Sequence, residues 1–286
     1  MASAPQSARL PDGRLHLQHG PIDLIIEACG ALAEVEAAYQ QAIDSFQTVL
    51  SGLVSELSVL RTPLDATTCP VLHNAIAQRM LAAVWPHRAR FITPMAAVAG
   101  AVADHMLAAL TQQRELRKAY VNNGGDIALY LNPGEHFKTG LVSRVDQPAI
   151  SGICTLHAAM PVRGIATSGW RGRSFSLGIA DAVTVLATHA AGADAAATLL
   201  GNAVICEHPA IQRQPARALD PDSDLGTLPV VVEVGLLDDA AVARALDNGQ
   251  KMATTLQQDG LINGAVLCLQ GQYRVIGQDV VLLPTA

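Results

Sequence analysis

The segment that most constrains how this chain can fold is Asn-Asn-Gly-Gly at residues 122–125, followed by Asp126. It stands between two apolar, β-prone runs, residues 119–121 and 127–131. Two strands joined by Asn and Gly predict a tight hairpin, because type I′ turns need φ > 0 at both central residues. Paired glycines also let a backbone come close to a ligand, where Asp126 would bring a charge. From this segment alone, a hairpin turn is favoured over the wall of a cofactor pocket.

The rest of the chain predicts an α+β protein with antiparallel sheet regions packed by helices. Half of the 286 residues are apolar and 15% are charged, which is typical of an ordered globular protein. Strand and helix patterns alternate irregularly, which favours this class over a doubly wound parallel sheet. We expect a disordered N-terminus at residues 1–13 and a single domain over residues 14–286, built as one body or as two closely packed subdomains.

Hydrophobic periodicity places the main elements. It predicts strands at 14–19, 22–28, 182–187 and 229–234 and a closing hairpin at 265–276. It also predicts one long or broken helix at 32–60, followed by helices at 70–84, 95–110, 191–204 and 238–258. Thr93 before Pro94 is a good N-cap arrangement for the third of these helices, which we expect to continue into a charged end at residues 114–118. Residues 207–228, rich in Pro, Asp and Arg, predict an exposed loop.

Charge and cysteine content limit the partners. A net charge of −6 argues against sequence-independent binding of nucleic acid, which needs a basic face. Five scattered cysteines without a C-x-x-C pair fit neither a disulfide framework nor a zinc cluster. Residues 1–10 lack the apolar core of a secretory signal, and the most apolar run, 94–110, contains Asp104 and His105. We predict a cytoplasmic protein with no membrane segment.

Asp194 and Thr198 are the first candidates for chemistry. They lie four residues apart near the start of a predicted helix, so a carboxylate and a hydroxyl share one helix face. Mg²⁺ prefers oxygen ligands and keeps positions for water and substrate phosphate. The alternative from spacing alone is that Asp194 caps its helix and Thr198 is packed.

A second candidate region covers residues 164–173. Small hydroxyl residues between glycines expose backbone N–H groups, and Arg171 and Arg173 could pair with phosphate. A solvated turn explains the same pattern, although Trp170 suggests ring stacking. Asp181 precedes a buried strand, where it must be exposed, hydrogen-bonded or bound to a metal. The histidines have no ligand spacing, so those at positions 73, 87, 105, 136, 157 and 189 are predicted to be structural.

The order of these segments carries a family resemblance. Along the chain it runs from a small-residue helix with Asp104 to Asn-Asn-Gly-Gly-Asp126, Ala-Thr-Ser-Gly169, Ala-Val-Thr-Val185 and Ala-Asp194-Ala-Ala-Ala-Thr198. It resembles the ApbE superfamily of FAD:protein FMN transferases. It is more similar still to an ApbE-like family of the UPF0280 type, which shares Thr-Pro-Met-Ala-Ala-Val-Ala-Gly100 and Ser-Gly-Trp-Arg-Gly-Arg-Ser174. The resemblance covers residues 14–280.

The resemblance implies a Mg²⁺ site and a cleft for a flavin nucleotide, FAD or FMN. Asp194 and Thr198 would contribute to the metal site, with Asp181 as a further acid, and Arg171 or Arg173 would hold phosphate. Asp181 and Asp126 are the candidate catalytic residues. The residues implied to line or face the cleft are Thr93, Asn123, Gly124, Gly125, Asp126, Thr167, Ser168 and Gly169.

Two departures from the transferase pattern leave the reaction open. The family's His-x-x-Asp-Pro motif is replaced by residues 174–181, which contain no histidine, and Ala99 stands where the family has a lysine. One alternative is an enzyme of another class, acting for example in one-carbon or pterin-cofactor metabolism. Another is a non-catalytic flavin-binding or assembly protein. The partners would be a nucleotide cofactor, an acceptor protein for a transferase, and further copies of the chain, since small-residue helices favour self-association.

Overall fold

The computed structural model describes residues 4–142, 150–277 and 280–282. The chain divides into two compact units. Unit 1 comprises Met1–His136, His157–Ala166 and Thr188–Ala195, and unit 2 comprises Phe137–Leu156, Thr167–Ala187 and Ala196–Ala286. Each unit is therefore assembled from segments that are far apart in the sequence.

Unit 1 is an antiparallel sheet with helices. Its strands, in spatial order, are β1 (Gln6–Arg9), β2 (Leu15–His19), β3 (Ile22–Gly30), β4 (Leu116–Asn123), β5 (Asp126–Leu131) and the first part of β8 (Gly164–Ser168). Its helices are α1 (Leu32–Phe46), α2 (Val49–Val54), α3 (Leu57–Leu60), α4 (Ala75–Val84) and α5 (Val98–Thr111), with short 3-10 turns η1 (Trp85–His87) and η2 (Pro94–Ala97). Helix α6 (Ala190–Ala203) starts in unit 1 and continues in unit 2.

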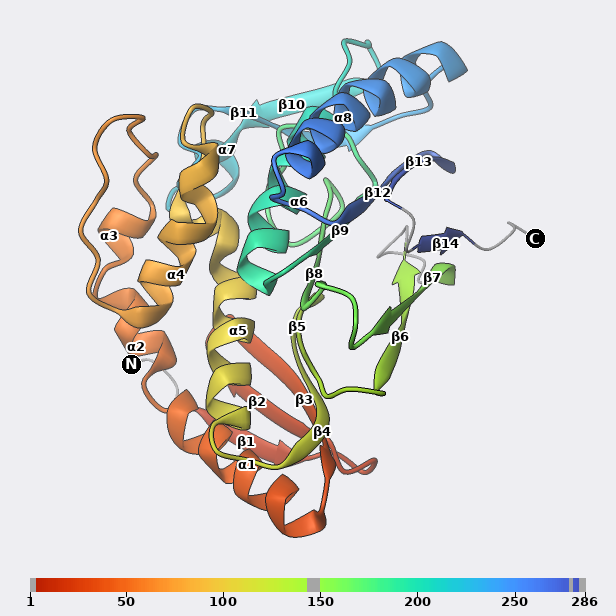
Figure 1. Ribbon diagram of the computed structural model, residues 1–286. Coiled ribbons are helices and arrows are strands. Elements are labelled where there is room, and N and C mark those ends of the chain that lie inside the picture. Colours follow the sequence, from red (N-terminus) through yellow and green to blue (C-terminus); the bar gives the residue numbers. More distant parts are fainter. Residues whose placement is uncertain (1–3, 143–149, 278–279, 283–286) are drawn as a thin grey trace. The chain divides into compact units, whose positions relative to one another are not determined.

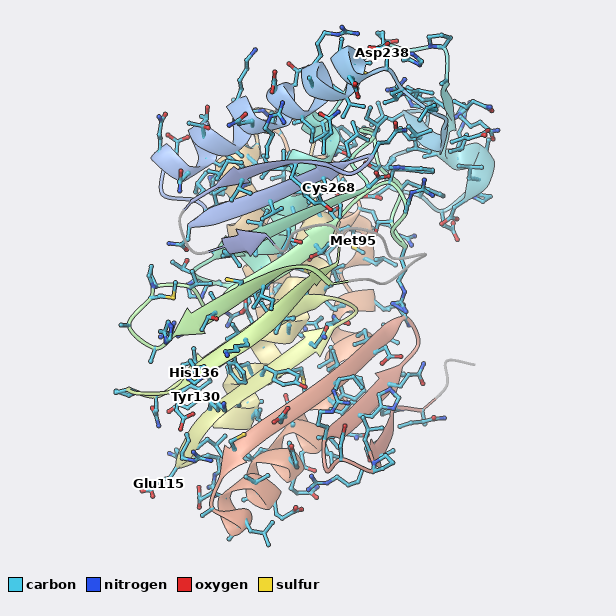
Figure 2. The ribbon with its side chains drawn as sticks, turned by 90° about the vertical axis from the view of Figure 1, so that its right-hand side faces the viewer. Met95, Glu115, Tyr130, His136, Asp238 and Cys268 are labelled. Carbon is cyan, nitrogen blue, oxygen red and sulfur yellow. The ribbon has the colours of Figure 1, made fainter. Side chains whose placement is uncertain are left out.

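One face of the unit 1 sheet forms the core. Residues of β2 and β3 alternate between buried and partly buried positions, as expected for strands covered on one side. Helix α1 packs on β2 and β3, α5 packs on β4 and β5, and the two helices contact each other (Figure 1). Phe46 and Met106, both at most 1% exposed, fill this layer, and burying each side chain contributes about 2 kcal/mol. Figure 2 looks onto the opposite face, with Tyr130 labelled on β5.

The Asn-Asn-Gly-Gly segment is a hairpin turn between β4 and β5, as the sequence favoured. Asn123 pairs with Asp126 across the strands. Gly124 and Gly125 have φ of 65° and 115°, which side chains rarely allow. The Gly125 N–H donates to Asn122 Oδ1 at 2.8 Å, so the turn is closed by its own asparagine.

Several sequence-based boundaries are wrong in unit 1. Strand β1 lies inside residues 1–13, where disorder was predicted, because it pairs with β2 through its backbone; residues 1–3 are outside the described part. Helix α4 begins after Asn74, whose side chain caps it, and not at residue 70. Residues 114–118 do not extend α5, because Gln113 takes φ of 55° and the chain then enters β4.

Unit 2 contains the remaining strands, except for two end residues, His136 and His157, which belong to unit 1. They are β6 (His136–Val142), β7 (Ile150–His157), β9 (Ala182–Ala187), β10 (Ile211–Pro215), β11 (Pro229–Val234), β12 (Gly264–Leu269), β13 (Gln272–Ile276) and β14 (Val280–Leu282). Strand β12 pairs antiparallel with β9 and with β13. Strands β9 and β12 are buried along their whole length, which explains their unbroken apolar runs. Helix α8 (Asp239–Gln258) packs along β12 and β13 (Figure 1).

The predicted loop at 207–228 is corrected in part. It contains β10 and the short helix α7 (Ala216–Leu219), because β10 finds a partner in β11 that the loop composition could not reveal. Every strand pair with a described register is antiparallel. The α+β class is confirmed.

By length and composition alone, one stretch of the described residues could cross a membrane. It is Pro94–Thr111, with a mean hydropathy of 1.3 over 18 residues, half of which are buried in the protein.

Candidate functional site

The N-terminus of α5 receives its cap from a distant aspartate. Its own N-cap residue is Ala97, which has no side-chain acceptor, so the first N–H groups of the helix need partners from elsewhere. The Asp194 carboxylate supplies them: Oδ2 accepts from the Gly100 N–H at 2.9 Å, and Ala99 N–H also donates to it. Asp194 therefore caps a helix, as one sequence interpretation allowed, but the helix is α5 and not its own.

The N-terminus of α6 is capped in return by α5. Asp104, a buried residue of α5, accepts from the N–H groups of Ala190 and Ala191 at 3.1 and 2.9 Å. The two helix starts meet closely at Gly100, where a Cβ would collide with the carbonyl group of Ala190. Each carboxylate thus lies at the positive end of the other helix dipole, which favours its charge. All of these contacts are within unit 1.

Sequence reasoning used Asp104 only as a marker of the motif order and missed this role. A signal was present for α6, whose start is rich in alanine and has no Ser, Thr, Asp or Asn directly before it, whereas Thr93 hid the same lack at the start of α5. Such starts need acceptors from another part of the fold. Which carboxylate serves which helix could not be read from spacing.

The hairpin brings a second carboxylate to Asp194. Burial, and next to it the charge of Asp126, raise the pKa of Asp194 well above its usual value, while the backbone donors of Gly100 and Ala99 act in the opposite direction. Two carboxylates that share one place repel each other, and each makes the other harder to ionise. A divalent cation would relieve that repulsion.

Asn123, the last residue of β4, connects the hairpin to the start of α5 by a hydrogen bond. Asn123 is 7% exposed, and its Nδ2 donates to the Ala99 carbonyl at 3.1 Å. The residue that pairs with Asp126 across the turn is thus fixed next to the α5 start. In this way the structure brings together four of the predicted site residues: Asn123, Gly124, Asp126 and Asp194.

The carboxylate oxygens at this site suit a hard cation that binds through few protein ligands. Among the described residues, no group of three or more His, Cys, Asp or Glu side chains is arranged to hold an ion. Mg²⁺ does not need such a cage, because it keeps several waters and often binds through one or two carboxylates plus substrate phosphates. Asp126 and Asp194 fit that requirement. Thr198 follows Asp194 by four residues on α6 and is partly buried.

Thr93 has a structural place that differs from its predicted one. It is 3% exposed and precedes η2, but its side chain makes no cap hydrogen bond to that turn. The predicted helix start is divided between η2 and α5, since Pro94–Ala97 form a 3-10 turn before the α-helix begins at Val98. The Thr93 carbonyl accepts a hydrogen bond from the Ala96 N–H at 3.1 Å.

In unit 2, Asp181 is fully engaged by hydrogen bonds. The carboxylate is 7% exposed and accepts from Trp170 Nε1 at 3.1 Å, from Arg171 Nε at 3.2 Å and from the Gln270 N–H at 2.6 Å. The Arg171 guanidinium also stacks over the Trp170 ring at 4.3 Å. The sequence left Asp181 to be exposed, hydrogen-bonded or bound to a metal. In the structure it is hydrogen-bonded, and one of its donors is the Arg171 guanidinium.

Gln270 explains why a strong acceptor is needed at position 181. Its φ of 46° is unusual for a residue with a side chain. Its backbone N–H donates to Asp181, its Nε2 donates to the Gly235 carbonyl at 2.8 Å, and its Oε1 accepts from Leu237 N–H at 3.1 Å. These bonds hold a strained residue in place, so Asp181 supports the turn between β12 and β13.

The remaining predicted residues of unit 2 lie on β8 and the loop that follows it. Thr167 Oγ1 is 2.9 Å from Thr184 Oγ1 of β9. Gly169 has no room for a side chain, because a Cβ there would lie 2.5 Å from the Asp181 carbonyl oxygen. Ser168 is partly buried and Arg173 is exposed. Arg171 is bound to Asp181, and Arg173 is the more exposed arginine of the pair.

A cavity of about 550 Å³ lies elsewhere in unit 1. Its lining includes Arg9, Arg14, Glu27 and Tyr39, with the Arg9 guanidinium 4.0 Å from the centre of the Tyr39 ring. None of the residues predicted from the sequence to form a site belongs to its lining.

A protein-family model described as AbpE bacteria matches residues 7–275. A UPF0280 protein of Methanosarcina barkeri is 30% identical over 191 residues, which are 63% of this chain and 69% of that protein. A UPF0280 protein of Methanothrix thermoacetophila is 39% identical over 114 residues, which are 40% of this chain and 46% of that protein.

The fold has a counterpart among solved structures. The ApbE protein of Thermotoga maritima MSB8 matches with a TM-score of 0.50, covering 96% of this chain and 97% of its own, at 12% sequence identity. At that identity the likeness concerns the fold alone.

Proposed function

This chain belongs to the AbpE bacteria family, and on that premise we propose that it carries a magnesium-assisted site for a phosphorylated cofactor, a flavin nucleotide above all. The resemblance to an ApbE-like family of the UPF0280 type, drawn from motif order, is confirmed by the family model and the relatives. Binding of Mg²⁺, FAD or FMN is the part that we propose.

The observation that carries the proposal is the pair of carboxylates at the α5 start. Asp194 keeps a raised pKa although backbone N–H groups stabilise its charge, because burial and Asp126 outweigh them. We propose that Asp126 and Asp194 hold the ion and that Thr198, one turn later on α6, adds a hydroxyl oxygen. A bound Mg²⁺ would neutralise negative charge on the phosphate oxygens of the cofactor.

Other residues of the chain would bind and orient the cofactor. The Gly124–Gly125 turn lets backbone approach a ligand, since neither residue has a side chain. The resemblance supports Thr167, Ser168 and Gly169 as further contacts. Arg173, which is exposed and follows the turn from Gly169 to Gly172, is the better phosphate ligand of the two arginines, because Arg171 already serves Asp181.

The two candidate catalytic aspartates have different proposed roles. Asp126 lies beside Asp194 and stays a candidate for catalysis. Asp181 accepts three hydrogen bonds and supports the β12–β13 turn. We therefore propose that Asp181 is a positioning residue for the loop that bears Arg171 and Arg173.

Titration of the purified protein with FAD and FMN, with and without Mg²⁺, tests this function. We expect binding that depends on Mg²⁺ and that weakens at least about tenfold in Asp194→Asn and Asp126→Asn, a loss of about 1.4 kcal/mol. Asp44→Asn, an exposed change on α1, serves as the control. Equal affinity without Mg²⁺ and in both variants, or no binding of either flavin, would contradict the proposal.

A second function, flavin binding without transfer, is favoured by one observation. The residues that replace the family's His-x-x-Asp-Pro motif contain no histidine, and their last residue, Asp181, is occupied by structural hydrogen bonds. Mass spectrometry of a threonine- or serine-containing acceptor protein after incubation with FAD and Mg²⁺ separates the two. A mass increase by one FMN group supports transfer, and an unchanged mass with retained FAD binding supports the carrier.

A further inference from the structure

Two histidines that the sequence placed 21 positions apart face each other in the structure. His136 begins β6 and His157 ends β7, and both side chains are exposed. Their ring centres are 5.7 Å apart with 39° between the ring planes. Figure 2 labels His136. Both residues belong to unit 1, and sequence spacing had predicted each to be structural.

The pairing of the two strand ends explains why the rings meet. Strands β6 and β7 are neighbours in one sheet, and Ala158 N–H donates to the Glu135 carbonyl at 3.1 Å just beyond their ends. His136 and His157 are the strand residues next to this hydrogen bond, one on each strand. Side chains at adjoining positions of neighbouring strands lie close together.

The backbone on both sides of this pair is fixed. His157 donates its N–H to Met160 Sδ at 3.1 Å and accepts from Met160 N–H at 3.0 Å. Arg163 donates to the Ala158 carbonyl at 2.7 Å, which holds the same turn. On the other strand, Lys118 Nζ donates to the His136 carbonyl at 3.1 Å. The positions from which the two rings project are therefore set before any ligand binds.

The ring separation suits a shared metal ion. A metal about 2.0–2.1 Å from a ring nitrogen lies about 3 Å from the ring centre, so two rings on one ion have centres about 5 to 6 Å apart at tetrahedral or wider angles. The observed 5.7 Å is in that range. We infer that His136 and His157 form a binding site for one borderline transition-metal ion, Cu²⁺, Ni²⁺ or Zn²⁺, whose remaining positions are taken by water.

Nearby charges set the strength of this site. Glu135, beside His136, pairs with Arg117 at 3.0 Å and with Lys118 at 3.7 Å. The carboxylate thus offsets cations that would repel a metal. With two protein ligands, the site has modest affinity and follows the usual preference of imidazole sites, with Cu²⁺ bound more tightly than Ni²⁺ or Zn²⁺. Mg²⁺, which requires oxygen ligands, does not compete.

Calorimetric titration of the protein without a histidine tag tests the inference. Cu²⁺, Ni²⁺ and Zn²⁺ are added separately to the wild type, His136→Ala, His157→Ala and His73→Ala, the last being an exposed histidine outside the pair. We expect one Cu²⁺ site per chain in the wild type and in His73→Ala. Each variant of the pair should lose at least about tenfold in affinity, since a single imidazole remains.

Electron paramagnetic resonance of the Cu²⁺ complex gives a second measurement. The wild type should show hyperfine coupling to two nitrogens, and each single variant of the pair to one. Unchanged Cu²⁺ affinity in both variants, or loss of the site in His73→Ala, would overturn the inference. Asp194→Asn should leave Cu²⁺ binding intact, so this test and the Mg²⁺ test fail independently.

Discussion

Asp181 in unit 2 is buried and Asp194 in unit 1 is partly buried, and each accepts a hydrogen bond from a backbone N–H, yet the charges around the two carboxylates differ. Asp181 faces a guanidinium at 3.2 Å and an indole N–H. Asp194 faces the carboxylate of Asp126, and burial and that charge raise its pKa. One aspartate has a cation as partner, and the other has an anion as neighbour.

This difference in neighbouring charge distinguishes a structural aspartate from one that is typical of a functional site. A carboxylate with a cation and three donors stabilises the loop that it holds, and nothing is gained by adding a ligand. A carboxylate beside another carboxylate destabilises the fold until a proton or a cation arrives, which is typical of functional sites. Both residues follow small-residue segments in the sequence, so only the tertiary environment distinguishes them. Substitutions at the two positions test that distinction.

The largest effect is expected from removing the supporting carboxylate. Asp181→Ala leaves Arg171, Trp170 Nε1 and the Gln270 N–H without their acceptor. Breaking a buried ion pair costs about 3–5 kcal/mol. Since Arg171 is 30% exposed, we expect a loss near the lower end, about 3 kcal/mol, in urea denaturation. Asp222→Ala, in an exposed turn, is the control and should change stability by less than about 0.5 kcal/mol. A similar small change in Asp181→Ala would remove the contrast between the two aspartates.

The charge contrast is sharpest when each aspartate becomes asparagine. At position 181 the new amide must turn its NH₂ toward one of three donors, and we expect a loss of about 2 kcal/mol in the free energy of unfolding. At position 194 the amide oxygen can still accept from Gly100, while its NH₂ can donate to Asp126. Stability should stay equal or rise by about 0.5 kcal/mol. Two losses of the same size would show that Asp194 is a structural residue like Asp181.

How far the sequence predicted this site depends on the range of the interactions. The Asn-Asn-Gly-Gly turn was predictable because φ > 0 at Gly124 and Gly125 is a local requirement. The helix that carries Asp194 followed from hydrophobic periodicity, with its start placed one residue late. The contact between Asp194 and the α5 start was not predictable, because it joins residues 94 positions apart.

The elements and contacts that the sequence did not predict also depend on residues far apart in the chain. Strand β1 and strand β10 form because β2 and β11 are available to pair with them, and neither has a strong pattern of its own. The meeting of His136 and His157 depends on the pairing of β6 with β7, which only the fold sets. In contrast, the buried runs of β9 and β12 were visible because burial on both faces leaves a continuous apolar sequence.

A packing change tests what keeps Asp194 in its place. In Gly100→Ala, the new methyl group would collide with the Ala190 carbonyl, so α5 and α6 must move apart at their N-termini. We expect a loss of about 2 kcal/mol and a weaker dependence of stability on the residue at 194. Gly192→Ala on α6 is the matched control, since no atom lies within 4 Å of its Cβ. It should stabilise the protein by about 0.5–1 kcal/mol. A loss in both variants would point to the α6 helix and not to the contact.

The pH dependence of stability gives the finest test of the charge at Asp194. Its pKa in the folded state is raised above the ordinary 3.8 by burial and by Asp126, so the folded protein binds this proton more tightly than the unfolded chain. The resulting stabilisation is complete below pH 3.8 and is lost as pH rises through the raised pKa of the folded state. One proton gives a slope of at most about 1.4 kcal/mol per pH unit. Asp194→Asn should flatten the curve in this window, whereas Asp44→Asn should not. Asp104, whose pKa burial also raises, accounts for any slope that remains in Asp194→Asn. Because a cation takes the place of the proton between the two carboxylates, added Mg²⁺ should raise stability at neutral pH in the wild type and leave Asp194→Asn unchanged. A curve that keeps its full slope in Asp194→Asn would mean that the unrelieved charge of unit 1 lies on another group.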